Sequence, residues 1–268
     1  MIARHLFRHL GARQAPFLIA CSLLFGLFQF LVCAAAGGAN IGRVLEVVLS
    51  SLPPVFQNIL TTQFPGGLTA RGLLAFGWNH PVAHASGTAV AIVLASRAVA
   101  GEIETGAAEL LLSQPLSRVT YFATYGIFAL LALAGLSSSG LAGMMAGQAV
   151  FHIEPFPAGR MLALAVNYFL LQSTWFAIGL AFSASGREGG RIAGIGFLLA
   201  LASYFAQAIG LLWSDAAFVL PWSLHHYFSP QGILLGTATP LRSFLTLLAV
   251  TSAGLGVAAW RFQRRDLP

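Results

Sequence analysis

The sequence predicts an all-α integral membrane protein that crosses the bilayer six times as a single domain. Of its 268 residues, 57% are hydrophobic and only 8% are charged, with a mean hydropathy of +0.79, whereas about a quarter of the residues of a soluble domain are charged. No polar stretch is long enough to fold separately. The apolar residues instead gather in six segments of about 20 residues or more, the length that a helix needs to span. These segments are residues 15–36, 80–100, 119–151, 161–182, 192–213 and 241–260.

The first 14 residues predict an amphipathic interfacial helix on the inner membrane surface. Arg4 and Arg8 recur at helical spacing, with Leu6 and Leu10 among the apolar residues between and beyond them. The arginines can therefore face anionic headgroups while the apolar side enters the interface. The alternative interpretation is the charged region of a signal peptide. Residues 15–36 are longer than a typical signal-peptide core, however, so we expect an uncleaved first span.

Residues 37–79 predict a long outer connection before the second span. Apolar residues in the stretch 41–52 recur at helical spacing, and Pro53 ends that pattern. Its charges and prolines argue against a further span, so we expect an interfacial helix there. The second span follows at residues 80–100, with Arg97 near its inner end, where a long side chain can reach water.

A polar segment at residues 101–118, GEIETGAAELLLSQPLSR, separates the second span from the third. Pro115 predicts a short helix that stops near Gln114, because proline disfavours helix in the residue before it. Ser117 can then cap the helix of the third span. The segment combines a leucine ridge with carboxylates, so it suits neither lipid nor water, and we expect it to rest on another protein. The residues concerned are Glu102, Glu104, Glu109, Leu110, Leu111 and Leu112.

The third span is longer than one bilayer requires, at roughly 48 Å as a continuous helix. Small residues recur in it every four positions, at Gly135, Ser139, Gly143 and Gly147. Such a stripe permits close contact with a neighbouring helix, either within the chain or in a second subunit.

Two connections follow the later spans. Residues 183–191 form a tight polar turn that holds Arg187, Glu188 and Arg191. Residues 214–240 form a second outer connection, and aromatic residues at its start and within it predict an interfacial belt. The aromatic residues are Trp213, Phe218, Trp222, Tyr227 and Phe228.

The arginines predict the orientation. All 14 basic residues are arginine, and with the N-terminus inside, ten lie on inner segments and four on outer ones. The positive-inside rule therefore predicts that both termini, residues 101–118 and residues 183–191 are cytoplasmic, in a multi-pass protein of the bacterial inner membrane. The net charge of +6 needs no nucleic-acid partner, because this topology already accounts for the arginines.

Several kinds of chemistry are disfavoured. The absence of lysine excludes a Walker A motif, and with it ATP hydrolysis by this chain through a P-loop. Cys21 and Cys33 lie about 18 Å apart along one predicted helix, too far for a disulfide. An intramembrane hydrolase would need a nucleophile and a base, or paired carboxylates, at membrane depth. No Asp or Glu lies in the middle of a predicted span, and no serine stands in a GxSxG setting.

Histidines and polar residues on or near the spans leave two alternatives open. Weak candidates for metal ligands are His80, His84, His225 and His226 on the outer side, and a membrane metal or haem protein stays an alternative. Polar residues within spans serve helix contacts or line a pathway. The candidates for a pathway are Asn167, Gln172, Tyr204 and Gln207.

Residues 101–118 resemble the cytoplasmic signature of ABC-2 type transporter permeases, an acidic GxE followed by a GT-x-E-x-LL-x-x-P-x-x-R pattern. This chain departs from the pattern slightly, since Thr105 precedes Gly106 and Ala107 occupies the usual threonine position. The six-span layout, the basic N-terminal helix and the Arg-Arg-Asp ending are similar as well. The resemblance thus covers essentially the whole chain and implies the type V exporter-like architecture of that family.

The resemblance also implies a function. A second permease subunit, identical or different, would complete the path through the lipid bilayer, and separate cytoplasmic ABC ATPase subunits would bind ATP and Mg, so that this chain itself holds no cofactor and is not an enzyme. We expect the ATPase to dock on Glu102, Glu104, Glu109, Leu110, Leu111, Leu112, Arg118, Arg187, Glu188 and Arg191. Within the family, the histidine-bearing outer side resembles the permease used in copper-site maturation of nitrous oxide reductase, which is an alternative assignment.

Overall fold

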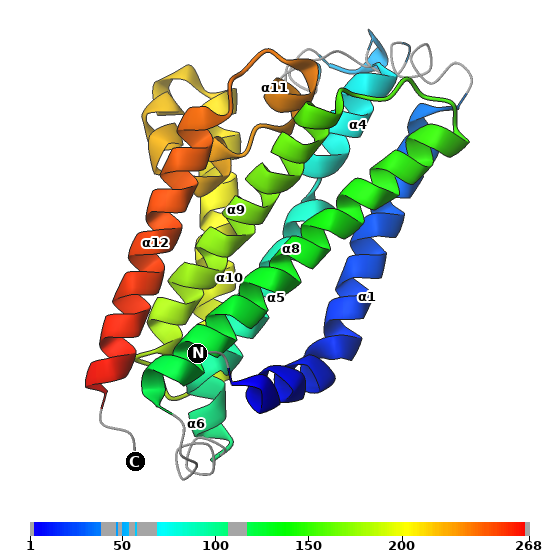
Figure 1. Ribbon diagram of the computed structural model, residues 1–268. Helices are drawn as coiled ribbons and strands as arrows, with labels where there is room; N and C mark the ends of the chain where they lie inside the picture. The colour runs from blue at the N-terminus through cyan, green and yellow to red at the C-terminus, as the bar shows by residue number, and fades with distance from the viewer. Residues whose placement is uncertain are drawn as a thin grey trace.

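The computed structural model describes residues 3–38, 47, 50–53, 57, 69–106 and 117–265. Within these residues the regular secondary structure is helical, and six helices are long and apolar enough to cross a membrane. The long helices run side by side in one bundle, with the beginning of the first helix and the end of the last at the same end of it (Figure 1). We call that end the terminal side and the opposite end the far side.

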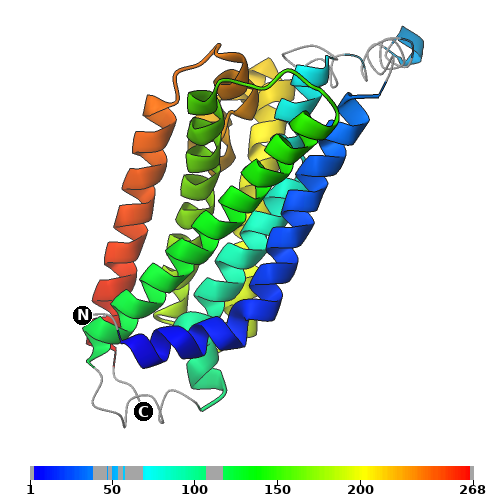
Figure 2. The same ribbon diagram turned by 45° about the vertical axis from the view of Figure 1, so that its right-hand side comes forward.

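The first helix, α1 (Arg4–Ala36), contains both the predicted interfacial segment and the predicted first span. Figure 2 shows that its first turns lie across the terminal side before the helix turns along the bundle. Pro16 lies inside this helix, where it has no amide hydrogen to donate and its ring displaces the preceding turn. Leu6 and Leu10, in the first turns, are buried. The amphipathic segment is therefore one arm of a bent helix.

The second span begins earlier than the sequence predicts. Helix α4 (Ala70–Asn79) precedes α5 (Pro81–Ser96), and Leu74 and Trp78 of α4 are buried in the core. The prediction that residues 70–79 belong to a connection is therefore wrong, because this stretch satisfies its backbone as a helix and buries its apolar face against the bundle. The interfacial helix expected at residues 41–52 lies largely outside the described residues.

The second span is broken at His80. This residue has an extended backbone (φ −68°, ψ 144°), and its Nδ1 accepts a hydrogen bond from the amide of Val82 at 3.2 Å. Pro81 then occupies the first turn of α5, where its missing amide hydrogen costs nothing. At the other end α5 continues into a π-helical turn (Arg97–Gly101) and the short α6 (Glu102–Glu104).

The remaining spans are α8 (Arg118–Val150), α9 (Ala158–Ser183), α10 (Gly189–Leu212) and α12 (Leu241–Arg264). The hydroxyl of Ser117 caps α8 as predicted, accepting from the amide of Thr120 at 3.1 Å. Helices α5 and α9 lie mostly buried in the middle, whereas α1, α10 and α12 expose much of their apolar surface. Exposed leucines on apolar helices are the surface that a bilayer covers.

The small-residue stripe of α8 lies partly against α1. A side chain at Gly143 would collide with the backbone of Gly26, and one at Gly147 would collide with Cys33. The backbone oxygen of Ser139 would lie 3.0 Å from a Cβ atom at Gly26, whereas Gly135 has open space around it. Three of the four stripe residues thus meet α1 within the chain.

The far-side connection between α10 and α12 folds back into the bundle. It consists of two 3₁₀ helices, η2 (Ser214–Trp222) and η3 (Leu224–Tyr227), and of α11 (Pro230–Leu235). Trp213, Phe218 and Trp222 are exposed, as an interfacial belt requires, but Phe228 is buried. Its predicted place in the belt is wrong, because the chain after Trp222 turns inward. The amide of Asn167 on α9 holds this inward segment by donating to the carbonyl of Tyr227 at 3.0 Å.

Candidate functional site

Two regions of the bundle gather candidate functional side chains. The first is the terminal side, where the polar segment between α5 and α8 begins. Glu102 is buried there, and its carboxylate accepts a hydrogen bond at 2.6 Å from Arg13, on the arm of α1. Next to this ion pair, Arg97 donates to the side-chain oxygen of Gln14 at 2.8 Å. The arm of α1 is therefore tied to the end of the second span by two side-chain contacts.

Glu104 connects the same segment to α10. One of its carboxylate oxygens accepts from the amide of Gly189, the first residue of α10, at 2.7 Å. A carboxylate at a helix N-terminus satisfies a free amide and interacts favourably with the helix dipole. A side chain at Gly189 would approach the Cα atom of Gly101 to 3.1 Å, so the two backbones meet closely here.

The described start of the polar segment forms one short helix and a turn. α6 ends at Glu104, and Gly106 has a φ of +72°, the left-handed conformation that commonly ends a helix. Glycine adopts that conformation without steric cost, and the predicted helix that stops near Gln114 lies largely outside the described residues. The predicted docking residues Glu109, Leu110, Leu111 and Leu112 lie outside the described residues.

The π-helical turn at Arg97–Gly101 has partners from two other helices. The hydroxyl of Ser183, the last residue of α9, accepts from the amides of Val99 and Ala100 at 3.3 and 3.0 Å. From α8, the hydroxyl of Tyr121 donates to the carbonyl of Ala98 at 2.6 Å. A wide turn alters the regular hydrogen-bonding pattern of a helix, and these side chains bond its backbone groups.

Other predicted docking residues lie on the same side. Arg118 donates to the carbonyl of Arg265 at 2.6 Å and thereby binds the end of α12. Exposed positions on the terminal side are occupied by Arg187, Glu188 and Arg191. Sequence reasoning missed Arg13, Ser183 and Tyr121. Only Arg13 had a signal in the sequence, because it is a charged residue three positions before Pro16, at which α1 bends.

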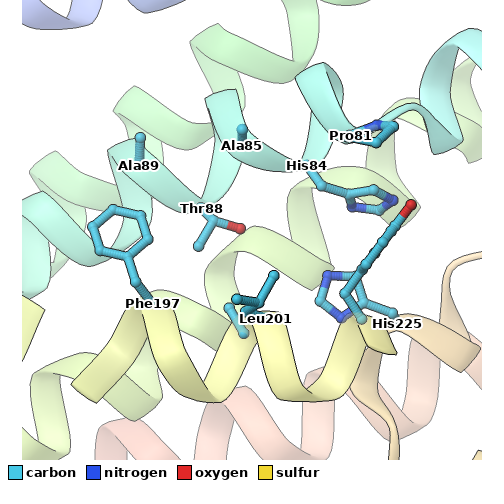
Figure 3. Close-up of a pocket in the computed structure, with 10 residues that line it drawn as sticks. Pro81, His84, Ala85, Thr88, Ala89, Phe197, Leu201 and His225 are labelled. Carbon is cyan, nitrogen blue, oxygen red and sulfur yellow. The ribbon is translucent and has the colours of Figure 1, made fainter. Parts of the chain in front are cut away.

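The second region is a cavity of about 470 Å³ between α5 and α10 (Figure 3). Its walls are mainly apolar, and Figure 3 shows His84 and His225 at one end of it and Phe197 and Ala89 at the other. The two imidazole centroids lie 4.9 Å apart, and both residues are buried. His225 reaches this place because η3 lies inside the bundle.

The four histidines named as weak metal candidates do not gather. His84 and His225 meet in the cavity, whereas His80 caps α5 and His226 lines a separate pocket of about 370 Å³. Among the described residues, no group of three or more His, Cys, Asp or Glu side chains could hold a metal ion. Two imidazoles alone fall short of the three or four ligands of a typical zinc site.

The four pathway candidates lie in three different settings. Tyr204 lines the cavity between α5 and α10, and Gln207 lines the separate pocket near His226. Asn167 holds the inward segment by donating to the carbonyl of Tyr227 at the end of η3. Gln172 is buried next to Gly87, and neither atom of its amide has a hydrogen-bond partner among the described residues.

Comparisons with known proteins add no family. No protein-family model matches the chain, and no curated protein matches it significantly.

Proposed function

We propose that this chain is the membrane-spanning permease subunit of an ATP-binding cassette exporter, driven by a separate cytoplasmic ATPase. The sequence resemblance at residues 101–118 motivates the proposal, and the contacts of the segment's first residues support it most. Glu102 contacts the arm of α1 and Glu104 contacts the start of α10. Force applied to this segment would therefore reach α1 and α10 as well as α5, to which the segment is joined.

A rigid connection of this kind is what a transmission element requires. A partner can shift a bundle between two arrangements only if its motion is passed on by packed or hydrogen-bonded groups. The π-helical turn, bonded by Ser183 and Tyr121, lies directly before the segment. Such turns are frequent at functional sites, where the backbone changes its local path.

Co-purification tests the proposal. A tagged chain purified from its native membrane is expected to bring along a P-loop ATPase, and the pair, reconstituted in liposomes, to hydrolyse ATP faster than the ATPase alone. The double variant Glu109→Arg/Leu111→Asp should lose the partner and the stimulation. Glu154→Arg is the matched control, since this exposed far-side carboxylate lies away from the segment. Retained binding and stimulation in the double variant would show that the segment is no docking site.

A further inference from the structure

The cavity between α5 and α10 borders the lateral surface of the bundle, which faces the lipid. Two residues of α10 that line it, Phe197 and Leu201, are 40% and 51% exposed. They belong to a helix that is long and apolar enough to span a membrane. A molecule dissolved in the hydrocarbon core would therefore reach this cavity without crossing water.

His84 presents an unused hydrogen-bond acceptor at the polar end of the cavity. Its Nε2 lies 3.3 Å from the side-chain oxygen of Asn79. An amide oxygen only accepts, so Nε2 carries the proton and Nδ1 is left with a lone pair. That Nδ1 is buried and has no hydrogen-bond partner among the described residues. An unsatisfied buried acceptor is costly, and a ligand that donates to it is correspondingly favoured.

His225 presents the complementary donor. Its Nδ1 lies 3.0 Å from the hydroxyl oxygen of Ser203. That oxygen already accepts from the amides of Leu224 and His225, at 3.0 and 3.4 Å, so it has little room for a third donor. Its own hydrogen can go to Nδ1 or to the hydroxyl oxygen of Ser223, which lies 3.2 Å away and donates its own hydrogen to the carbonyl of Ser203. When Ser203 donates to Nδ1, the proton of a neutral His225 resides on Nε2. Burial, with a smaller contribution from neighbouring His84, lowers the pKa of His225 well below its ordinary value, which favours this neutral form.

We propose that the cavity binds a neutral lipophilic alcohol or phenol drawn from the bilayer. A hydroxyl group both accepts and donates, so it can accept from Nε2 of His225 and donate to Nδ1 of His84. The hydrocarbon part would extend past Thr88 towards Phe197. None of the lining residues is acidic, arginine or lysine, so a charged headgroup would be desolvated without a counter-charge. The volume lies within the range of small-molecule sites.

A photoaffinity experiment tests the proposal on the purified full-length chain in lipid nanodiscs, without any ATPase. The probe is a long-chain primary alcohol with a diazirine in the chain, and the matched probe is its methyl ether, which accepts a hydrogen bond but cannot donate one. We expect saturable labelling of the α5 and α10 peptides, competed by unlabelled alcohol. The ether should bind about tenfold more weakly, since it lacks one hydrogen bond.

Variants distinguish labelling inside the cavity from labelling by probe that is merely dissolved in the lipid. Ala200→Phe fills the cavity from α10, where Ala200 is buried, and should abolish saturable labelling. Ala202→Phe is the matched control on the exposed face of the same helix and should leave it unchanged. His225→Phe should weaken alcohol labelling to the level of the ether. Equal labelling by both probes in the unmodified chain, or undiminished labelling in Ala200→Phe, would overturn the proposal, and neither result bears on ATPase docking.

Discussion

At the scale of single residues, the stability of the terminal side depends on charged and polar groups that are paired inside the bundle. Glu102 is only 6% exposed, and its partner in the described residues is Arg13. Removing one partner of a buried ion pair leaves the other charge without compensation, which is far more costly than removing both. Because the Arg13 side chain is 38% exposed, solvent reduces this cost below that of a fully buried pair.

The Arg13–Glu102 pair can be tested by substitution. Arg13→Gln should lower the free energy of unfolding by about 1–3 kcal/mol, because Glu102 stays buried without its partner. Denaturant titration in detergent micelles measures this value. Arg13→Gln/Glu102→Gln should recover part of the loss, since two neutral amides replace the charges.

Arg8→Gln is the control for this measurement, since Arg8 is exposed on the same arm of α1. We expect a change within about 0.5 kcal/mol for it. If Arg13→Gln behaved like Arg8→Gln, the ion pair would not contribute to holding the arm.

At the scale of helices, close approach decides which elements can move independently. Helices α1 and α8 touch where small residues face each other, at Gly26, Ser139 and Gly143. In lipid no hydrophobic force drives two apolar helices together, so backbone proximity and packing carry the contact. The bend of α1 at Pro16 then redirects its arm towards Glu102. Helix α1 is thus held at two places, by its packing against α8 and by the ion pair on the terminal side.

Substitution of the stripe glycines tests whether they act through contact with α1 or only through helix propensity. Gly143→Leu should separate α1 from α8 and lower the free energy of unfolding by about 3 kcal/mol or more, because the new side chain meets the Gly26 backbone, which cannot move aside. Gly135→Leu is the matched control, as Gly135 has open space around it on the exposed face of the same helix. Unfolding titrations of the two variants side by side give the answer. Equal effects would show that the stripe acts through helix propensity alone.

At the scale of the whole molecule, the bundle sorts its charges between two ends. Residues 101–106, the turn at residues 184–188 and both ends of the described chain lie on the terminal side (Figure 1). Together with the neighbouring Arg97, Arg118 and Arg191, these segments hold ten of the 14 arginines. Segments that the arginine count assigns to one side of the membrane therefore lie together in space. The positive-inside rule predicts that this side faces the cytoplasm.

Thiol labelling tests that orientation. In a Cys21→Ala/Cys33→Ala background, Phe218→Cys on the far side should react with a membrane-impermeant maleimide added to spheroplasts. Arg187→Cys on the terminal side should react only after the membrane is permeabilised. Both positions are exposed, so burial does not explain a difference. The reverse pattern would place residues 101–118 outside the cell and exclude docking of a cytoplasmic ATPase.

Much of the architecture follows from the sequence alone, because it depends on local properties. Run length and apolarity locate the six spans, and Ser117 locates a cap. The small residues of α8 indicate a close contact, although they do not say which of them make it. What escaped prediction depends on contacts between distant parts of the chain. The sequence of α4 resembles that of a connection, and only the structure shows that one face of this helix is buried. Nothing in the sequence around Ser183 indicates that its hydroxyl binds the π-helical turn.

The two candidate sites differ in the same way, since one is recognisable from local sequence and the other depends on contacts between distant residues. Residues 101–118 stand out in the sequence because a polar segment between apolar spans is a local contrast. The polar end of the cavity is invisible there, because His84 and His225 are 141 positions apart and meet only when the chain after α10 folds inward. Periodicity and composition determine which helices form and which ends share a side. Only tertiary packing determines which side chains meet, since that depends on how the helices pack and not on the properties of any one of them.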